Sequence, residues 1–137
     1  MLDRASLQVL GERWTFLILR EIFAGRHLFA EIRHQLGVAP NLLSARLRTL
    51  VTAGVLERRE YREERQRSRE CYHLTAAGAE LRIILTALEQ WGDKHRLRPS
   101  GPRVEQRSLS RGTAVQVGFV DELRREVDSE DVVVVLA

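Results

Sequence analysis

The first forty residues carry apolar side chains at helical spacing, in segments that are each followed by a glycine. Side chains that recur every three or four positions predict amphipathic helices over residues 2–10, 12–23 and 28–36. The residues expected to face inward are Leu7, Leu10, Trp14, Leu17, Ile18, Ile22, Phe29, Ile32 and Leu36. Glycine ends a helix readily, and the glycines that follow these segments are Gly11, Gly25 and Gly37.

A fourth helix, expected over residues 40–53, has a distinct start and a distinct end. Pro40 suits the first helical position, and Gly54 suits the left-handed residue after the last turn. The inward stripe is Leu43, Leu47, Leu50 and Val51, and the opposite side carries Asn41, Ser44, Ala45, Arg48, Thr49 and Thr52. No carboxylate occurs on that outer side, so it can lie against a polyanion such as DNA. This segment alone leaves open an ordinary amphipathic surface helix.

The two helices around Gly37 form a helix-turn-helix arrangement, because a tight turn containing glycine joins them. After Gly54 the pattern predicts two short strands over residues 55–61 and 70–75, joined by a polar loop. A hairpin directly after the second helix is the layout of a winged helix. Thr75 is a suitable N-cap for a long helix over residues 76–96. Leu81, Leu85, Leu88 and Trp91 run along this helix at nearly coiled-coil spacing.

The last forty residues differ from the rest in composition. Arg-Pro-Ser-Gly-Pro, residues 98–102, predicts a linker. Short strands are expected over 103–109, 113–120 and 132–136, with a turn or one helical turn at 122–127. Three such strands are too small to be stable alone, so we expect them to pack on the helical part or on a partner, or to be partly disordered. The expected division is a DNA-binding and dimerisation domain over 1–97, and a linker with a small β module over 98–137.

The positive charge lies in the part that contains the helix-turn-helix. The formal charge of the chain is +3: residues 1–98 hold 17 Lys and Arg against 12 Asp and Glu, a net of +5, and residues 99–137 hold 5 against 7, a net of −2. Such a balance permits nucleic-acid binding without requiring it. Residues 57–70 contain six arginines and five glutamates, as an exposed ion-pair surface would. The acid-free stretch 65–69, RQRSR, is instead suited to phosphate, and both interpretations stay open from these residues alone.

Four stretches together resemble the HxlR-type winged helix-turn-helix transcriptional regulators. They are VLGERWTFLILREIFAG (9–25), FAEIRHQLGVAPNLLSARLRTLVTAGVLERREY (29–61), CYHLTAAGAEL (71–81) and LEQWGDKH (88–95), in the order and spacing of that family. The resemblance implies a prokaryotic, dimeric, DNA-binding regulator, which we expect to be a repressor. It places the helix at 40–53 in the major groove, and the hairpin at 55–75 on the backbone or in the minor groove.

The partners implied are double-stranded DNA with a palindromic or inverted-repeat operator, a second copy of the chain, and a possible small-molecule effector of unknown identity. The expected DNA-contacting residues are Asn41, Ser44, Ala45, Arg48, Thr49, Arg65, Arg67 and Arg69. The expected dimer interface is Leu7, Leu85, Leu88 and Trp91, because the apolar seam of the long helix exceeds what one small core needs. A two-fold dimer presents two recognition helices about 34 Å apart, one turn of DNA. The alternative function is a protein–protein interaction module, whose mark would be an apolar outer face on residues 41–52.

No pattern in the chain predicts catalysis or a cofactor. The four histidines lack ligand spacing and the glycines form no phosphate-binding loop, so we do not expect an enzyme. Many relatives carry a C-terminal module with paired cysteines that resembles a zinc ribbon. Here Ser110 stands at one of those cysteine positions, and a structural zinc needs about four thiolate or imidazole ligands. We therefore expect a metal-free β module.

The remaining features concern redox chemistry and location. Cys71 is the single cysteine, which excludes an internal disulfide. We expect it to be a small half-buried residue of a strand, not a thiol sensor. The longest apolar run, 132–137, has six residues, so no membrane span is expected. The amphipathic start after Asp3 and Arg4 differs from a signal peptide, and we expect a cytoplasmic protein.

Overall fold

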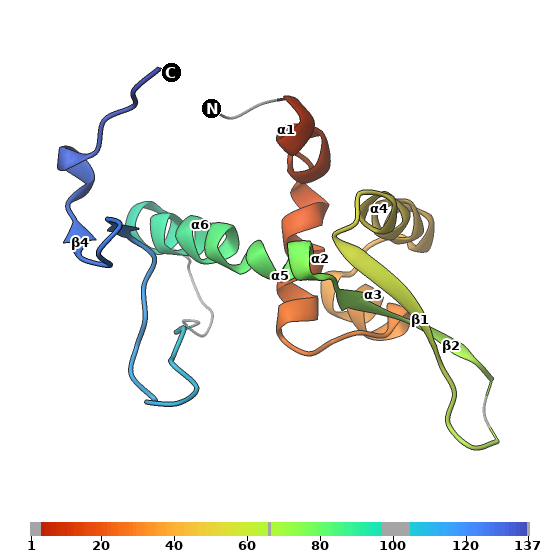
Figure 1. Cartoon of the computed structure of the whole chain (residues 1–137). Coiled ribbons are helices and arrows are strands. Elements are labelled where there is room, and N and C mark those ends of the chain that lie inside the picture. Colours follow the sequence, from red (N-terminus) through yellow and green to blue (C-terminus); the bar gives the residue numbers. More distant parts are fainter. Residues whose placement is uncertain (1–3, 66, 97–104, 137) are drawn as a thin grey trace. The chain divides into compact units, whose positions relative to one another are not determined.

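The computed structural model describes residues 4–65, 67–96 and 105–136 of the chain (Figure 1). The chain divides into two compact units, Met1–Arg82 and Ile83–Ala137, and each is described by itself. The linker expected over residues 98–102 lies outside the described residues. The domain division expected at residues 97 and 98 stays a prediction.

The first unit begins with the four expected helices, α1 (Arg4–Leu10), α2 (Arg13–Phe23), α3 (Phe29–Leu36) and α4 (Pro40–Thr52). The side chains with the least exposure are Ile18, Leu19, Ile22, Ile32, Leu43, Leu47, Leu50 and Leu56. The buried arc of α2 is wider than the expected stripe, since Thr15, Leu19 and Glu21 are also buried whereas Trp14 and Leu17 are only half-buried. The cause is that α2 contacts α1, α3, α4 and the second wing strand, so more than one side of it is covered.

The boundaries of α4 follow the signals in the sequence. Pro40 occupies its first turn after Ala39, whose backbone is extended. Gly37 ends α3 at a φ of 61°, and Gly54 follows α4 at a φ of 76°. Both lie in the left-handed region, which favours glycine. The turn and the helix that it introduces are therefore confirmed.

The wing is an antiparallel hairpin of β1 (Leu56–Tyr61) and β2 (Arg69–Leu74), with Leu56 opposite Leu74 and Tyr61 opposite Arg69. At its base the α2–α3 connection joins the same sheet. The Tyr72 amide donates to the His27 carbonyl over 2.8 Å, and Leu28 forms a bridge with Cys71. Because strand side chains alternate, one face carries residues 56, 58, 60, 70, 72 and 74, and the other carries 57, 59, 61, 69, 71 and 73.

The long helix expected over residues 76–96 is two helices, so this prediction was wrong. α5 (Ala76–Glu80) and α6 (Arg82–His95) are separated by a turn at Leu81. The Leu81 amide bonds to the Gly78 carbonyl three residues back, over 3.1 Å, which tightens the last turn of α5. Glycine at position 78 also lowers helix propensity there. The N-cap prediction is confirmed, because Thr75 Oγ1 accepts from the Gly78 amide over 3.1 Å.

The second unit contains little regular structure after α6. β3 (Phe119–Val120) pairs antiparallel with β4 (Glu126–Val127), a 3-10 helix η1 covers Ser129–Asp131, and a single bridge joins Arg107 to Ala114. The Gln90 side chain of α6 both donates to the Val117 carbonyl over 3.1 Å and accepts from the Val117 amide over 2.6 Å. The Gln90 side chain thus makes the two hydrogen bonds with Val117 that the backbone of a neighbouring strand would make.

The strands predicted in this unit are largely absent from the described residues. Residues 103 and 104 lie outside them, 105–109 and 113–118 form only the single bridge, and residues 132–136 form no strand. The prediction at 132–136 was wrong because it rested on β-branched composition alone. A strand also needs a partner ladder, and Val133–Leu136 are more than three-quarters exposed.

Candidate nucleic-acid interface

The outer side of α4 forms two neighbouring rows of short or cationic side chains. Asn41, Ala45 and Thr49 make one row, and Ser44, Arg48 and Thr52 make the other, since positions four apart lie one above the other on a helix. All are exposed except Ser44, which is half-buried. The Thr49 hydroxyl donates to the Ala45 carbonyl over 3.0 Å, so its proton is engaged within the helix. No carboxylate occurs in α4.

A groove of about 640 Å³ separates the second row from the wing. Its walls come from both elements: Ser44, Arg48, Val51 and Thr52 of α4, and Leu56, Glu57, Arg58, Glu70 and Tyr72 of the hairpin. Ser44 and Arg48 border the groove, whereas Asn41, Ala45 and Thr49 belong to the row beside it.

A polar cluster in the groove contains a carboxylate. Tyr72 donates its hydroxyl to Glu70 Oε2 over 3.1 Å, and Arg58 Nη1 lies 3.4 Å from Glu70 Oε1. Burial, followed by the charge of Glu70 and this hydrogen bond, raises the pKa of Tyr72, against the opposing effects of Arg58 and Arg48. Tyr72 therefore keeps its proton and donates it. Sequence reasoning missed Glu70 and Tyr72, because only the strand register shows that they share a face with Arg58.

The three arginines expected to contact phosphate lie at the far end of the wing. Arg65 and Arg67 are exposed in the loop, and Arg69 is exposed at the start of β2. Arg65 has a φ of 70°, a left-handed conformation uncommon for a residue with a side chain. Among the described residues, no acidic side chain forms an ion pair with any of these three. They are thus available to an external anion.

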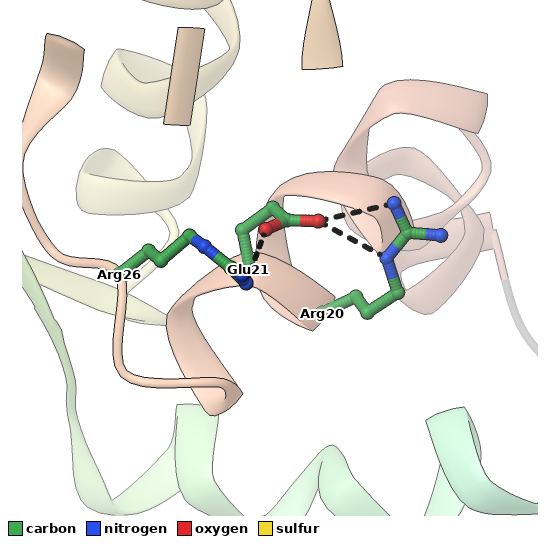
Figure 2. Close-up of polar contacts among 3 residues, drawn as sticks. All are labelled: Arg20, Glu21 and Arg26. Carbon is green, nitrogen blue, oxygen red and sulfur yellow. Dashed lines mark hydrogen bonds and ion pairs between the residues drawn. The ribbon is translucent and has the colours of Figure 1, made fainter. Parts of the chain in front are cut away.

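A buried carboxylate fixes the connection between α2 and α3 (Figure 2). Glu21 is 5% exposed and lies between two guanidinium groups. Its Oε1 accepts from Arg20 Nε over 3.2 Å and Nη2 over 3.1 Å, and its Oε2 accepts from Arg26 Nη1 over 2.9 Å. The Arg26 amide also donates to the Glu21 carbonyl over 3.0 Å. The network sets the position of the residues that follow Arg26, which pair with the wing.

Two stacked histidines lie where this connection meets the wing. The rings of His27 and His73 are 4.3 Å apart between centroids, and His27 Nδ1 is 2.9 Å from the Tyr72 carbonyl oxygen. Because that oxygen can only accept, Nδ1 carries the proton. Burial, then the charges of His27 and Arg59, lower the pKa of His73, against a weaker opposite effect of Glu57. The lowered pKa favours the uncharged form of the His73 ring, which stacks on His27 without charge repulsion between the two rings.

The HxlR-like helix-turn-helix family model matches residues 9–100 of this chain. The chain belongs to the HxlR-like family. The match spans α2 to α6 and therefore includes the helix-turn-helix, the wing and the groove between them. The family expected from the four sequence stretches is confirmed.

Relatives of this HxlR-like chain are named as transcriptional regulators. The HTH-type transcriptional regulator Mb3122 of Mycobacterium bovis is 42% identical over 102 residues, which are 74% of this chain but only 63% of Mb3122. The crystal structure of PA1607, described as a candidate transcription factor, has a TM-score of 0.77 and 32% identity, covering 94% of this chain and 89% of PA1607. PA1374 from Pseudomonas aeruginosa has a TM-score of 0.67 and 34% identity, with coverage of 96% and 89%.

These likenesses confirm the predicted fold class, a mainly helical winged helix-turn-helix with a two-stranded wing. The family match ends at residue 100. Coverage of 94% of the chain means that the likeness to PA1607 extends into the C-terminal part.

The residues expected at a dimer interface differ in exposure within the HxlR-like chain. Leu7 of α1 is 50% exposed, and Leu88 and Trp91 of α6 are each 51% exposed. Leu85 is only 8% exposed, so within a single chain its side chain is largely covered. The exposed Ile84 extends the row of Leu88 and Trp91 along α6. The interface itself stays a prediction.

The described residues of this HxlR-like protein show no candidate for a metal centre or a membrane-spanning helix. They contain no group of three or more His, Cys, Asp or Glu side chains placed to hold a metal ion. The helices that the structure describes include none with the length and apolar character needed to cross a membrane. Cys71 is buried, and its thiol donates to the Arg59 carbonyl over 3.4 Å. The expectations of a metal-free tail and of no thiol sensing stay predictions.

Proposed function

We propose that this protein is a cytoplasmic repressor that binds double-stranded DNA as a homodimer and recognises an inverted-repeat operator. α4 enters the major groove, and the wing lies on the backbone or in the minor groove. The observation that carries the proposal is the outer side of α4, which has two rows of short or cationic side chains and no carboxylate. A surface that bound another protein would instead present apolar side chains there.

Two further features suit a phosphate backbone. α3 and α4 begin after Leu28 and Ala39, neither of which caps the helix with its side chain. Free N–H groups at the start of a helix are good partners for phosphate. Arg65 and Arg67, without ion pairs among the described residues, supply positive charge at the wing tip. These contacts hold the protein on the duplex, and α4 reads the sequence.

Replacing Arg48 by alanine should weaken operator binding by about 1–3 kcal/mol, because a bidentate arginine–guanine contact discriminates by that amount. Binding to a scrambled duplex should weaken less. Arg67→Ala should weaken binding to both duplexes similarly and lower the salt slope by about one, as the loss of one phosphate contact does. The measurement is fluorescence anisotropy at several salt concentrations, on a duplex that the parent protein selects from a random pool and on its scrambled version.

Circular dichroism and sedimentation of both variants establish that they remain folded and assembled as the parent is. If Arg48→Ala bound the selected duplex as tightly as the parent, the recognition surface assigned to α4 would be wrong. If the parent selected no duplex at all, the interaction-module alternative would replace the proposal.

Sedimentation at micromolar concentration should give a species near twice the chain mass of 15.8 kDa. The exposed row Ile84, Leu88 and Trp91 on α6 provides apolar surface for a second copy. Leu88→Asp should shift the protein toward the monomer, since a buried unpaired charge opposes association. Val133→Asp, which adds the same charge at a 77% exposed valine, is the matched control. A parent that is monomeric at every concentration contradicts the proposal.

A further inference from the structure

Glu70 is an unusual residue for the groove of a DNA-binding face. It lies on the same face of the hairpin as Arg58 and Tyr72, and it lines the groove opposite Ser44 and Arg48 of α4. A DNA backbone that passed between a major-groove helix and the wing would follow this groove. A carboxylate there repels phosphate, so its presence calls for a physical explanation.

The carboxylate is held by two partners. The Tyr72 side chain is anchored because the residue is only 6% exposed, and its hydroxyl donates to Oε2 over 3.1 Å. The other carboxylate oxygen, Oε1, lies 3.4 Å from Arg58 Nη1. Glu60 lies directly across the hairpin, on the same face. Among the described residues Glu60 has no hydrogen-bond or ion-pair partner, so Glu70 is the oriented member of the two.

Pairing with Glu70 reduces the positive charge that Arg58 presents to DNA. A guanidinium whose charge is neutralised by a neighbouring carboxylate releases fewer counterions when it approaches a phosphate. The pair is exposed, with 60% of the Arg58 side chain and 52% of the Glu70 side chain accessible. Exposed ion pairs are weak, so a phosphate held close to Arg58 can replace the carboxylate. Whether the exchange occurs depends on how firmly the backbone is held in the groove.

We propose that Glu70 is a specificity-determining positioning residue that withholds Arg58 from DNA of arbitrary sequence. The inference rests on the proposed function. Non-operator binding consists almost entirely of phosphate contacts, so a withheld cation lowers it directly. On the operator, base contacts from α4 hold the backbone in the groove, and Arg58 exchanges Glu70 for phosphate. Glu70 thus acts through Arg58 and increases the ratio of operator to non-operator affinity.

The test is Glu70→Gln, which removes the charge and keeps the shape. Its affinity for the scrambled duplex should rise about five- to tenfold at 0.1 M salt, and the salt slope should steepen by about 0.9, as one more phosphate contact requires. Affinity for the selected duplex should rise less than about threefold, because Arg58 already contacts phosphate there. Glu60→Gln, with the same charge change directly across the strands, should leave the ratio of the two affinities unchanged.

A double variant tests whether the effect of Glu70 on DNA binding depends on Arg58. In an Arg58→Gln background, Glu70→Gln should no longer change the salt slope or the ratio of affinities. The inference is overturned if Glu70→Gln strengthens both duplexes equally, if Glu60→Gln matches it, or if its effect persists without Arg58. A parent protein that does not distinguish selected from scrambled DNA contradicts the proposed function instead, and that result is read before any variant is compared.

Discussion

Replacing Arg20 and Arg26 together by alanine is expected to lower the free energy of unfolding by about 3–5 kcal/mol, the cost of leaving a buried charge without partners. The side chain of Glu21 is only 7% exposed, and these two arginines supply its side-chain hydrogen bonds. Water cannot replace them fully at that depth. Urea denaturation followed by circular dichroism measures the change.

Two variants separate this cause from a general effect of lost charge. Arg58→Ala with Arg59→Ala removes two charges from exposed ion pairs and should cost no more than about 2 kcal/mol, since each such pair contributes about 0–1 kcal/mol. Adding Glu21→Met to the Arg20 and Arg26 double variant should restore most of the stability, because an apolar side chain of similar size needs no partner. A triple variant no more stable than the double would show that the loss has another origin.

Gly78→Ala is the second change expected to have a large effect, a loss of about 3 kcal/mol or more through overpacking. A Cβ at this position would lie 2.1 Å from the Val55 carbonyl oxygen and 3.1 Å from its carbon. Both are backbone atoms, so no side-chain rotation relieves the overlap. α5 would have to move away from the start of β1, where Thr75 now donates to the carbonyls of Gly54 and Val55.

Gly92→Ala is the matched control, because a Cβ there would meet no atom within 4 Å beyond its chain neighbours and the backbone of its own helix. Alanine in a helix interior is favoured over glycine by about 0.5–1 kcal/mol, so this variant should be slightly more stable than the parent. Thermal and urea midpoints of the two variants should therefore move in opposite directions. Equal midpoints would mean that α5 accommodates a methyl group, contrary to the packing described.

The sequence predicted best where local chemistry decides the structure. Pro40 and Gly54 set the ends of α4, and Thr75 caps α5 through its own side chain. It predicted less well where pairing or packing with another segment of the chain decides the structure. Residues 132–136 have strand composition but no ladder beside them, and Leu81 interrupts a continuous apolar seam because the turn before it is set by packing at Gly78.

The candidate site shows the same division. The outer residues of α4 follow from helical spacing, so Arg48 could be placed from the sequence. The role of the wing glutamates could not, because the five of them are interspersed among six arginines and only the register pairs Glu70 with Arg58 and Tyr72. Glu21 was equally hidden, since its burial depends on a fold in which α2 is covered on several sides.

The base of the wing is joined to the α2–α3 connection through His27 and Leu28, whereas its ladder ends at the pair Tyr61–Arg69. The described residues of the loop beyond that pair, 62–65, 67 and 68, are thus outside the sheet. After gene duplication, insertions or substitutions in this loop would change the DNA-backbone contacts proposed for the wing without disturbing the sheet or the helices. Under the proposed function, the base contacts of α4 and the phosphate contacts of the wing loop can therefore diverge independently among paralogues.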